Sequence, residues 1–214
     1  MSQNRIDELR KAVVEIDTDK VESICSCIIE EGVDPQLALT EGAIKGLQEV
    51  GALFEKDVYA LPELMLSVEV MNAARDILEP EILKANKTME KTGTILMGTV
   101  AHDIHDIGKK IVSAMLRAVG FQVIDVGNNI SPAKFVEHAK KIKPDIIGMS
   151  ALLTTTMPYA DETAKALREA GIKARLILGG APVTKEYADK IGVAFAENAG
   201  EACRVCSRLM KEEA

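Results

Sequence analysis

VAHDIHDIG, at residues 100–108, is the stretch that decides the fold of this chain. It follows an apolar run, TILMGT at residues 94–99, and precedes KKIVSAML at residues 109–116, where apolar residues recur at helical spacing. This order predicts a strand, a loop and a helix. The loop holds two histidines and two aspartates. In open α/β sheets, ligands bind at the carboxyl ends of parallel strands, so this loop is the first candidate for a functional site.

The pattern of a strand followed by a helix repeats through the C-terminal half of the chain. We therefore expect an α/β fold at residues 89–214, with a doubly wound, Rossmann-like or flavodoxin-like sheet of five parallel strands. The expected strands are residues 94–99, 121–126, 145–149, 175–178 and 193–196. The expected helices are residues 107–119, 132–142, 158–170, 185–191 and a last one from about residue 200.

The N-terminal residues 1–88 have the apolar spacing of amphipathic helices and predict a four-helix bundle. The second helix ends at Gly32, and Asp34-Pro35 begins the third, which runs to Glu55. The fourth extends from Leu61 to Leu78 and is closed by Pro80. Residues 84–93 are polar and without periodicity, which predicts a linker between the two domains.

Composition excludes several classes of protein. The 214 residues carry a net charge of -7, so a nucleic-acid surface is not expected. No apolar run is long enough to span a bilayer and the N-terminus does not resemble a secretory signal, so we expect a cytoplasmic protein without membrane contact. Cys203 and Cys206 have the spacing of metal ligands, but they lie in a helical pattern without a second close pair, which favours a packing role.

Two further loops are expected beside residues 100–108. Residues 150–156 (SALLTTT) follow the third predicted strand, and residues 179–184 (GGAPVT) follow the fourth. In a right-handed parallel sheet these loops converge, and their glycines and small hydroxyl residues leave room for a large ligand. Neither a G-x-G-x-x-G nor a G-x-x-x-x-G-K-[ST] motif is present, so dinucleotides and nucleoside triphosphates lack the usual phosphate site.

The residues by themselves leave the chemistry of the loop open. His105 is a candidate metal ligand, with Asp103 as acceptor for its other ring nitrogen. Alternatively His102, Asp103, His105 and Asp106 bind zinc or iron directly. A third interpretation is a solvated polar loop without a role.

Three motifs in order carry a resemblance: Asp103-x-His105-x-x-Gly108, Ser150-x-Leu152 and Gly179-Gly180. Together they resemble the cobalamin-binding domain in which a protein histidine replaces the cofactor's own base. With the helical bundle in front, nearly the whole chain is similar to the corrinoid proteins that serve methylamine and related methyltransferases. One departure is His102, where related sequences commonly have glycine; it is a rival cobalt ligand, a partner-facing surface residue or a tolerated change, and we favour the surface interpretation.

The resemblance implies roles for individual residues. His105 would be the lower axial ligand of cobalt, Asp103 would hold its other nitrogen, and Ser150 would support Asp103. Gly108 would let the following helix begin close to the corrin. The residues implied in cofactor binding are Asp103, His105, Asp106, Ile107, Gly108, Ser150, Leu152, Thr154, Gly179, Gly180 and Ala181. On the fourth helix, Leu61, Met65, Leu66 and Met71 would cover the upper corrin face, or they belong to the plain bundle core.

The implied function is that of a methyl carrier, which is not an enzyme on its own. A substrate-specific methyltransferase would place a methyl group from a methylamine, a quaternary amine, methanol or a similar donor on cobalt(I), giving methylcobalamin. A second methyltransferase would pass it to coenzyme M or tetrahydrofolate, and a reductive activating protein would rescue oxidised cobalt, as in methanogenesis or acetogenesis.

Three rival functions share part of this pattern. The chain could be the cobalamin-binding subunit of an adenosylcobalamin-dependent mutase, a cobalamin-dependent regulator, or a metal protein without a corrinoid that uses the His/Asp loop. The helical bundle fits methyl transfer better than a mutase, and the acidic N-terminal half shows no basic recognition helix. The sequence names neither the methyl donor nor the final acceptor.

Overall fold

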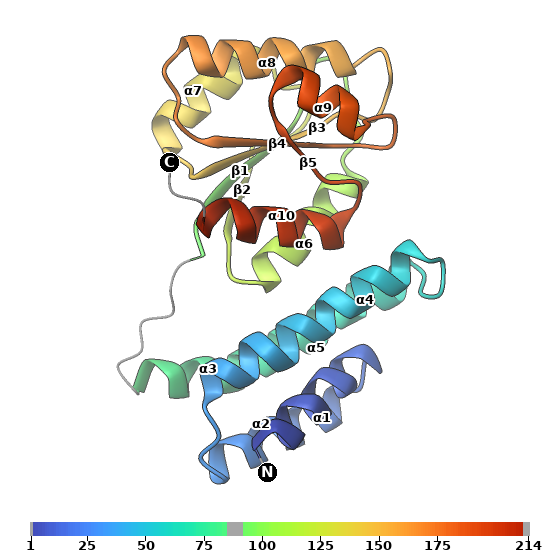
Figure 1. The fold of residues 1–214 in the computed structure, drawn as a ribbon, viewed down its shortest axis with the longest axis vertical. Coiled ribbons are helices and arrows are strands. Elements are labelled where there is room, and N and C mark those ends of the chain that lie inside the picture. The colour runs from blue at the N-terminus through green and yellow to red at the C-terminus, as the bar shows by residue number, and fades with distance from the viewer. Residues whose placement is uncertain (1, 85–91, 212–214) are drawn as a thin grey trace. The chain divides into compact units, whose positions relative to one another are not determined.

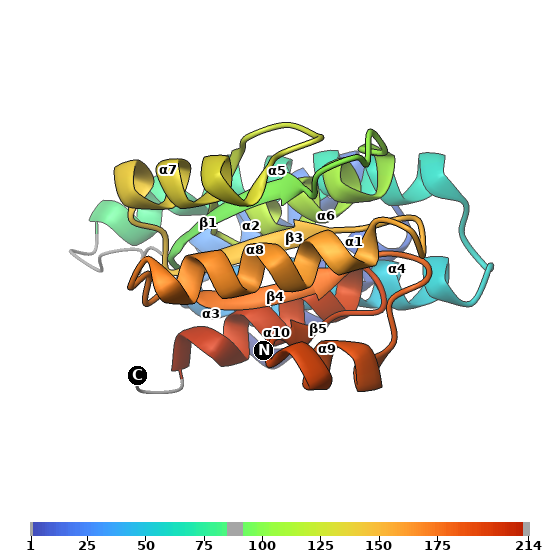
Figure 2. The ribbon, with the colours of Figure 1, turned by 90° about the horizontal axis from the view of Figure 1, so that it is seen from above.

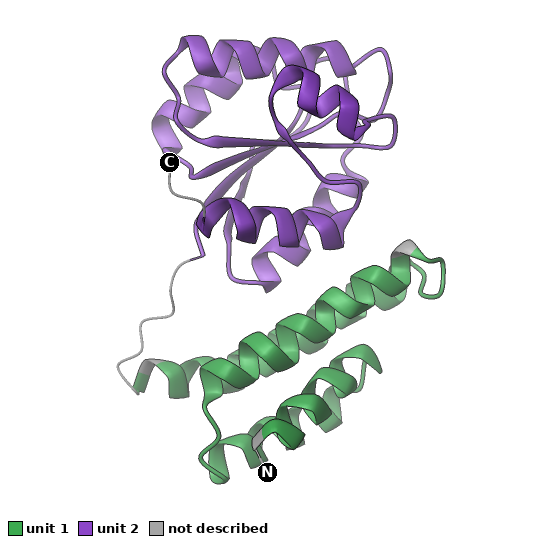
Figure 3. Ribbon diagram, viewed as in Figure 1, with its two compact units in different colours: residues 1–90 green, residues 91–214 purple. Residues whose placement is uncertain are grey.

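A computed structural model describes residues 2–84 and 92–211. The chain divides into two compact units (Figure 3): residues 1–90, here called the helical unit, and residues 91–214, the α/β unit. The predicted domain boundary, between residues 88 and 89, and most of the predicted linker lie outside the described residues. Within the described ranges, no helix is both long and apolar enough to cross a membrane.

The helical unit follows the predicted apolar stripes, with side chains from each long helix fully buried, among them Leu9, Ile28, Leu47 and Leu64. Asp34 caps a helix that begins with Pro35, as predicted, and its side chain accepts a hydrogen bond from the Gln36 N–H at 3.0 Å. The helical segments are α1 (Ser2–Val14), α2 (Thr18–Glu30), α3 (Pro35–Leu37), the π-helix η1 (Ala38–Ile44), α4 (Lys45–Glu55) and α5 (Leu61–Lys84).

The predicted third helix is one continuous stretch with a π-helical middle, η1, between α3 and α4. Two glycines lie where this stretch packs against α1. A Cβ atom on Gly46 would stand 2.8 Å from the Arg10 carbonyl oxygen, and one on Gly42 would stand 3.2 Å from that of Ile6. The two glycines therefore allow a close approach of backbones that larger residues would prevent.

The predicted end of the fourth helix at Pro80 is wrong, because α5 continues through Pro80 to Lys84. Proline removes one helical N–H and crowds the carbonyl group four residues earlier, that of Asp76. Both Pro80 and Asp76 are exposed, so water can bond to the carbonyl group that loses its helical partner. Burial of residues on the opposite side, such as Leu78 and Ile82, holds the helix together beyond the proline.

The α/β unit confirms the predicted alternation of strands and helices. Its order is β1 (Thr94–Thr99), α6 (Ile107–Ala118), β2 (Gln122–Asp125), α7 (Pro132–Ile142), β3 (Ile146–Ser150), α8 (Met157–Glu169), β4 (Arg175–Gly179), α9 (Lys185–Ile191), β5 (Ala194–Phe195) and α10 (Ala199–Lys211). All strand pairs are parallel, in the order β2-β1-β3-β4-β5. This is the doubly wound sheet that the sequence predicts.

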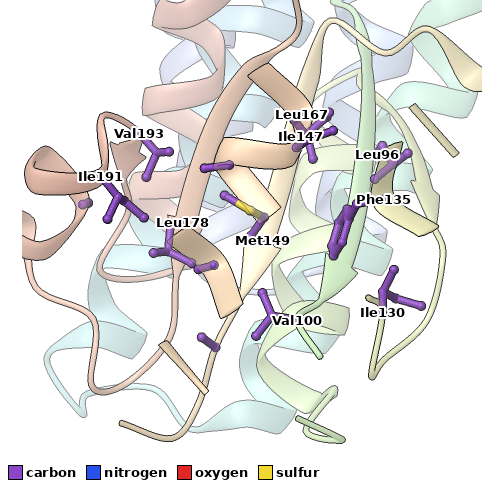
Figure 4. Packing of buried hydrophobic residues seen from close by; sticks show 14 of the residues in the cluster. Leu96, Val100, Ile130, Phe135, Ile147, Met149, Leu167, Leu178, Ile191 and Val193 are labelled. Carbon is purple, nitrogen blue, oxygen red and sulfur yellow. The ribbon is translucent and has the colours of Figure 1, made fainter. Parts of the chain in front are cut away.

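Helices cover both faces of the sheet (Figure 1), with α7, α8 and α9 on one side and α6 and α10 on the other. Figure 2, seen from above, shows α7 and α8 lying along the strands. The core on their side joins Leu96, Ile147 and Leu178 of three neighbouring strands to Phe135 of α7 and Leu167 of α8 (Figure 4). Because strand burial is nearly continuous, the sheet is a rigid support for the loops at its edge.

The strand order reverses at β1 and β3, which creates the crevice where doubly wound sheets bind ligands. Thr99, the last residue of β1, pairs with Ser150 at the end of β3, and Ser150 pairs with Gly179 at the end of β4. The three predicted loops therefore leave the sheet from one row of paired residues.

Candidate functional site

Three loops lie together at this edge: the His loop (residues 100–106), the Ser/Thr loop (151–156) and the Gly loop (180–184). The Val100 N–H donates to the Ser150 carbonyl at 3.0 Å, and the Ala151 N–H donates to the Gly179 carbonyl at 3.1 Å. Gly180 has φ +140°, and a Cβ atom there would stand 1.8 Å from the Ala151 carbonyl oxygen. Glycine is required at this position to bring the Gly loop against the Ser/Thr loop, and the predicted convergence of the loops is confirmed.

Asp103 holds the ring of His105. The His105 Nδ1 atom lies 2.8 Å from Asp103 Oδ1, and the His105 backbone N–H donates to the same oxygen at 3.0 Å. The Asp103 side chain is fully buried, whereas the His105 side chain is 45% exposed. In the described part of the chain, His105 Nε2 has no hydrogen-bond partner, so the ring presents this atom outward.

The second carboxylate oxygen of Asp103 is held by the Ser/Thr loop. Its Oδ2 accepts the Leu152 N–H at 2.7 Å and the Thr156 hydroxyl at 2.8 Å. The resemblance implied this support from Ser150, but no hydrogen bond from Ser150 to Asp103 occurs in the described residues, and Thr156 supplies the hydroxyl instead. A turn closed by the Thr156 N–H on the Leu153 carbonyl at 2.9 Å folds the loop back and brings Thr156, instead of Ser150, to the carboxylate.

Asp103 remains ionised far below neutral pH. Burial raises the pKa of its carboxyl group, because the charged form loses water, but the hydrogen bonds from Leu152, His105 and Thr156 outweigh burial and lower the pKa to about 2. An ionised Asp103 can only accept, so His105 Nδ1 is the donor, and in a neutral imidazole the lone pair then lies on Nε2. The site therefore offers one oriented nitrogen ligand.

Large apolar side chains of the same loops face solvent. Ile104 and Ile107 are 71% and 68% exposed, and Leu152 and Leu153 are 38% and 43% exposed. These four are the large exposed hydrophobic residues of the α/β unit within its described part, and all of them lie in or next to the loops of the site. A cluster of this kind marks a surface that an apolar ligand or partner covers.

The other predicted cofactor residues line the same loops. Asp106 precedes α6 and forms an ion pair with Lys110 at 2.6 Å; the hydrogen bond from Lys110 lowers the pKa of Asp106. Gly108 lies in the first turn of α6, and a Cβ atom there would meet nothing within 4 Å. Thr154 and Ala181 are exposed in the Ser/Thr and Gly loops.

The four predicted cap residues divide into two groups. Leu61, Met65 and Leu66, near the start of α5, are exposed, together with Val58 just before it. Met71 is fully buried in the helical unit and is a core residue. The helical unit thus has an apolar surface of its own at the start of α5.

His102 points its ring toward α8. The ring centroids of His102 and Tyr159 lie 4.6 Å apart, and the His102 backbone has φ +63°, a conformation that favours glycine. In residues 2–84 and 92–211, no group of three or more His, Cys, Asp or Glu side chains could hold a metal ion. Zinc and iron sites use several protein ligands, so the interpretation of the His/Asp cluster as a direct metal site is not supported. Cys203 and Cys206 are buried, as their predicted packing role requires.

A family model described as a B12 binding domain matches residues 93–204, and a second model with the same description matches residues 5–79. Trimethylamine corrinoid protein 1 of Methanosarcina mazei is 41% identical over 189 residues, which cover 87% of this chain and 88% of the relative. This chain belongs to the methyltransferase-associated corrinoid proteins. The predicted resemblance is confirmed.

Solved structures agree with this membership of the corrinoid proteins. A cobalamin-binding protein from Desulfitobacterium hafniense DCB-2 matches with a TM-score of 0.84 and 27% identity, over 95% of this chain and 98% of that one. The methanol:cobalamin methyltransferase complex MtaBC from Methanosarcina barkeri matches with a TM-score of 0.72 and 28% identity, over 98% of this chain and 81% of that one.

The residues of the site fit a corrinoid, the cofactor of this family. A single oriented imidazole suits a metal whose remaining ligands come from an organic ring. The exposed apolar residues of the same loops match the mainly apolar face of such a ring, and the open space at Gly108 leaves room for it.

Proposed function

We propose that this corrinoid protein is a methyl carrier in which His105 Nε2 is the lower axial ligand of cobalt. The bound corrinoid would supply a strongly nucleophilic metal that accepts a methyl group and gives it up again. The single observation that carries the proposal is the His105 imidazole, oriented by the buried Asp103 carboxylate in loops that expose large apolar side chains at the switch point of the sheet.

Asp103 and Thr156 set the state of the axial ligand. Because Asp103 is ionised, it favours the tautomer with the proton on Nδ1 and makes Nε2 a stronger donor. The Thr156 hydroxyl and the Leu152 N–H keep the carboxylate charged, and so stabilise a partial positive charge on the imidazole when Nε2 donates its electrons. Protonation of Asp103 would remove this support and weaken the donor.

The remaining residues would hold the body of the cofactor. Ile104, Ile107 and Leu152 would contact the corrin ring and exclude water from the metal. The displaced nucleotide tail would enter the crevice beside Ser150, Thr154 and the Gly loop, where a side chain on Gly180 would block the backbone.

The proposal assigns residues 1–88 as a cap and residues 89–214 as the cobalamin-binding domain. The exposed apolar residues Leu61, Met65 and Leu66 would cover the upper corrin face, which must open for a methyl group to arrive and leave. A bound cofactor would cover these side chains, which would account for exposed apolar residues at the start of α5.

The proposed methyl donor is a methylated amine, because a relative of 41% identity is named a trimethylamine corrinoid protein. A substrate-specific methyltransferase would activate the donor, and a complex of that kind, with methanol as substrate, is a structural neighbour. A second methyltransferase would pass the methyl group to coenzyme M or tetrahydrofolate, and a reductive activating protein would return oxidised cobalt to the active state.

The experiment is a methyl-transfer assay with the reconstituted protein. The full chain is loaded with hydroxocobalamin, reduced, and incubated with trimethylamine or methanol and the matching purified methyltransferase. We expect methylation of the cofactor with the amine, a lower rate for His105→Ala, and an unchanged rate for the surface control Lys165→Met. A chain that binds no corrinoid, or a His105→Ala variant as active as the original protein, would contradict the proposal.

A further inference from the structure

The loop after β2, residues 126–130 (VGNNI), here called the Asn loop, runs beside the His loop. Residues Val100 and Ile130 form a parallel bridge, and the Ile130 N–H donates to the Thr99 carbonyl at 3.0 Å. This loop comes from an edge strand of the sheet, yet it reaches the site at the switch point. It is a fourth loop beside the three that form the site.

Two asparagines of the Asn loop form hydrogen bonds with main-chain groups of three consecutive His-loop residues, 102–104. The Asn129 side-chain oxygen accepts the His102 N–H at 2.8 Å, and the Asn129 N–H donates to the Asp103 carbonyl at 2.9 Å. The Asn128 amide donates to the Ile104 carbonyl at 3.2 Å.

The next residue of the His loop is held from the sheet. The buried hydroxyl of Thr99 donates to the His105 carbonyl at 3.0 Å. Together with the contacts of the asparagines, this fixes the main chain of residues 102–105, the segment that carries the imidazole.

A buried lysine ties the Asn loop to α6. Lys109 is only 4% exposed; its ammonium group forms an ion pair with Asp125 and donates to the Gly127 carbonyl at 2.7 Å. Asp125 also accepts the Gly127 N–H at 2.9 Å. A buried charge is costly to desolvate, and here it holds the first turn of α6, the end of β2 and the Asn loop at one point.

We propose that Lys109, Asn128 and Asn129 are positioning residues for the axial ligand: they hold the His-loop backbone so that His105 presents Nε2 in its bonding orientation before cobalt arrives. The proposal rests on the proposed function, since it assumes that His105 is the ligand. Its physical basis is preorganisation. An exposed imidazole on an unrestrained loop would lose conformational entropy on binding cobalt, and that loss would weaken the bond.

The test uses two independent changes to the Asn loop. Lys109→Met with Asp125→Leu replaces both members of the ion pair by apolar side chains, so no unpaired charge remains, and both side-chain hydrogen bonds to Gly127 are lost. Asn129→Gly keeps the φ of +52° and the main-chain N–H, and removes the acceptor for His102.

The chain offers a matched control for each change. Lys165→Met removes an exposed ion pair with Asp161 on α8. Lys143→Gly introduces a glycine at a second position with φ +52°, the left-handed residue that ends α7. The controls reproduce the side-chain losses without touching the Asn loop.

Two readouts separate positioning from stability. The first is amide hydrogen exchange in the cofactor-free protein, where the His102 and His105 amides should exchange about 10-fold faster in both changed proteins, the change expected for the loss of about one hydrogen bond. Amides of β3 should keep their rates, and the controls should match the original protein.

The second readout is electron paramagnetic resonance of the cobalt(II)-loaded protein, in which a nitrogen ligand splits the signal. The equilibrium between histidine-bound and histidine-free cobalt should shift about 10-fold toward the free form in both changed proteins. The positioning role alone would be overturned if the folded variants showed unchanged exchange of the His102 and His105 amides and an unchanged cobalt(II) signal. It would also be overturned if the β3 amides exchanged faster by the same factor. Absence of a histidine nitrogen in the original protein would instead overturn the proposed function, and with it this inference. If the double variant does not fold, Asn129→Gly and its control decide the question.

Discussion

Thr156→Val tests the hydrogen bonds that keep Asp103 charged. Valine has nearly the shape of threonine, so the change removes the donor that lies 2.8 Å from Asp103 Oδ2 and leaves little cavity. A hydrogen bond to a charged group contributes about 1.5–3 kcal/mol. Because Leu152 and His105 still donate to the carboxylate, we expect the charged form of Asp103 to lose about 1.4 kcal/mol of stabilisation. This loss moves the pKa of Asp103 from about 2 to about 3.

The sign of the effect on stability follows from linkage. The folded-state pKa of Asp103 lies below its ordinary value of 3.8, so the ionised group stabilises the fold above that pH, and this contribution is lost as the pH falls through about 2. In Thr156→Val the contribution above pH 4 is smaller by about 1.4 kcal/mol and disappears at a higher pH. The variant is therefore less stable than the original protein at neutral pH and more nearly equal to it in acid.

The assay is a pH titration of the Asp103 carboxyl carbon by nuclear magnetic resonance in the cofactor-free protein. At pH 3 the original protein should remain ionised, whereas Thr156→Val should be about half protonated. Thr163→Val is the matched control: it is a buried threonine on α8 whose hydroxyl donates to the Tyr159 carbonyl at 2.7 Å and not to Asp103. An unmoved titration in Thr156→Val, or an equal shift in Thr163→Val, would refute the reasoning.

Glycine positions supply two further predictions. Gly180→Ala should lower the free energy of unfolding of the α/β unit by more than about 2 kcal/mol in urea titrations, because its Cβ would stand 1.8 Å from the Ala151 carbonyl oxygen. Gly108→Ala should leave the free energy of unfolding unchanged or slightly higher, because its Cβ meets nothing within 4 Å. The same variant should bind corrinoid more weakly in absorbance titrations. Equal stability of the two variants would contradict the first part, and undiminished corrinoid binding by Gly108→Ala the second. Gly46→Ala should destabilise the helical unit by about 1 kcal/mol, because contact of the new Cβ with the Arg10 carbonyl oxygen at 2.8 Å outweighs the better helix propensity of alanine. Faster amide exchange in α1 should report this loss. Unchanged exchange would show that α1 moves away from Gly46 without losing stability.

The spacing of apolar residues predicted the order of the strands and helices, because each buried face of a strand or helix requires apolar residues at regular intervals. It failed at Pro80, where exposure of the proline side of α5 lets the helix continue, and it could not reveal the π-helical segment η1. It also could not separate Met71, which is in the core, from Met65, which faces solvent, because both occur in the same helical pattern.

The sequence predicted the part of the site that lies close to the ends of the strands. His105, Asp103 and the glycine pair follow strands directly, so topology alone brings them together. Thr156 was missed because its place depends on a turn within the Ser/Thr loop, and the sequence shows several hydroxyl residues without indicating which one turns inward. The buried Lys109 was equally hidden, since the apolar spacing of α6 does not distinguish an inward lysine from an exposed one.

The central claim is that His105, rather than His102, is the protein ligand of cobalt. Electron paramagnetic resonance of the cobalt(II)-loaded protein, with histidine labelled by nitrogen-15, tests it most directly. We predict nitrogen splitting that changes with the label, persists in His102→Ala and is lost in His105→Ala, because the His102 ring contacts Tyr159 while His105 Nε2 points outward. Splitting that ignores the label, or that survives in His105→Ala, would contradict the account.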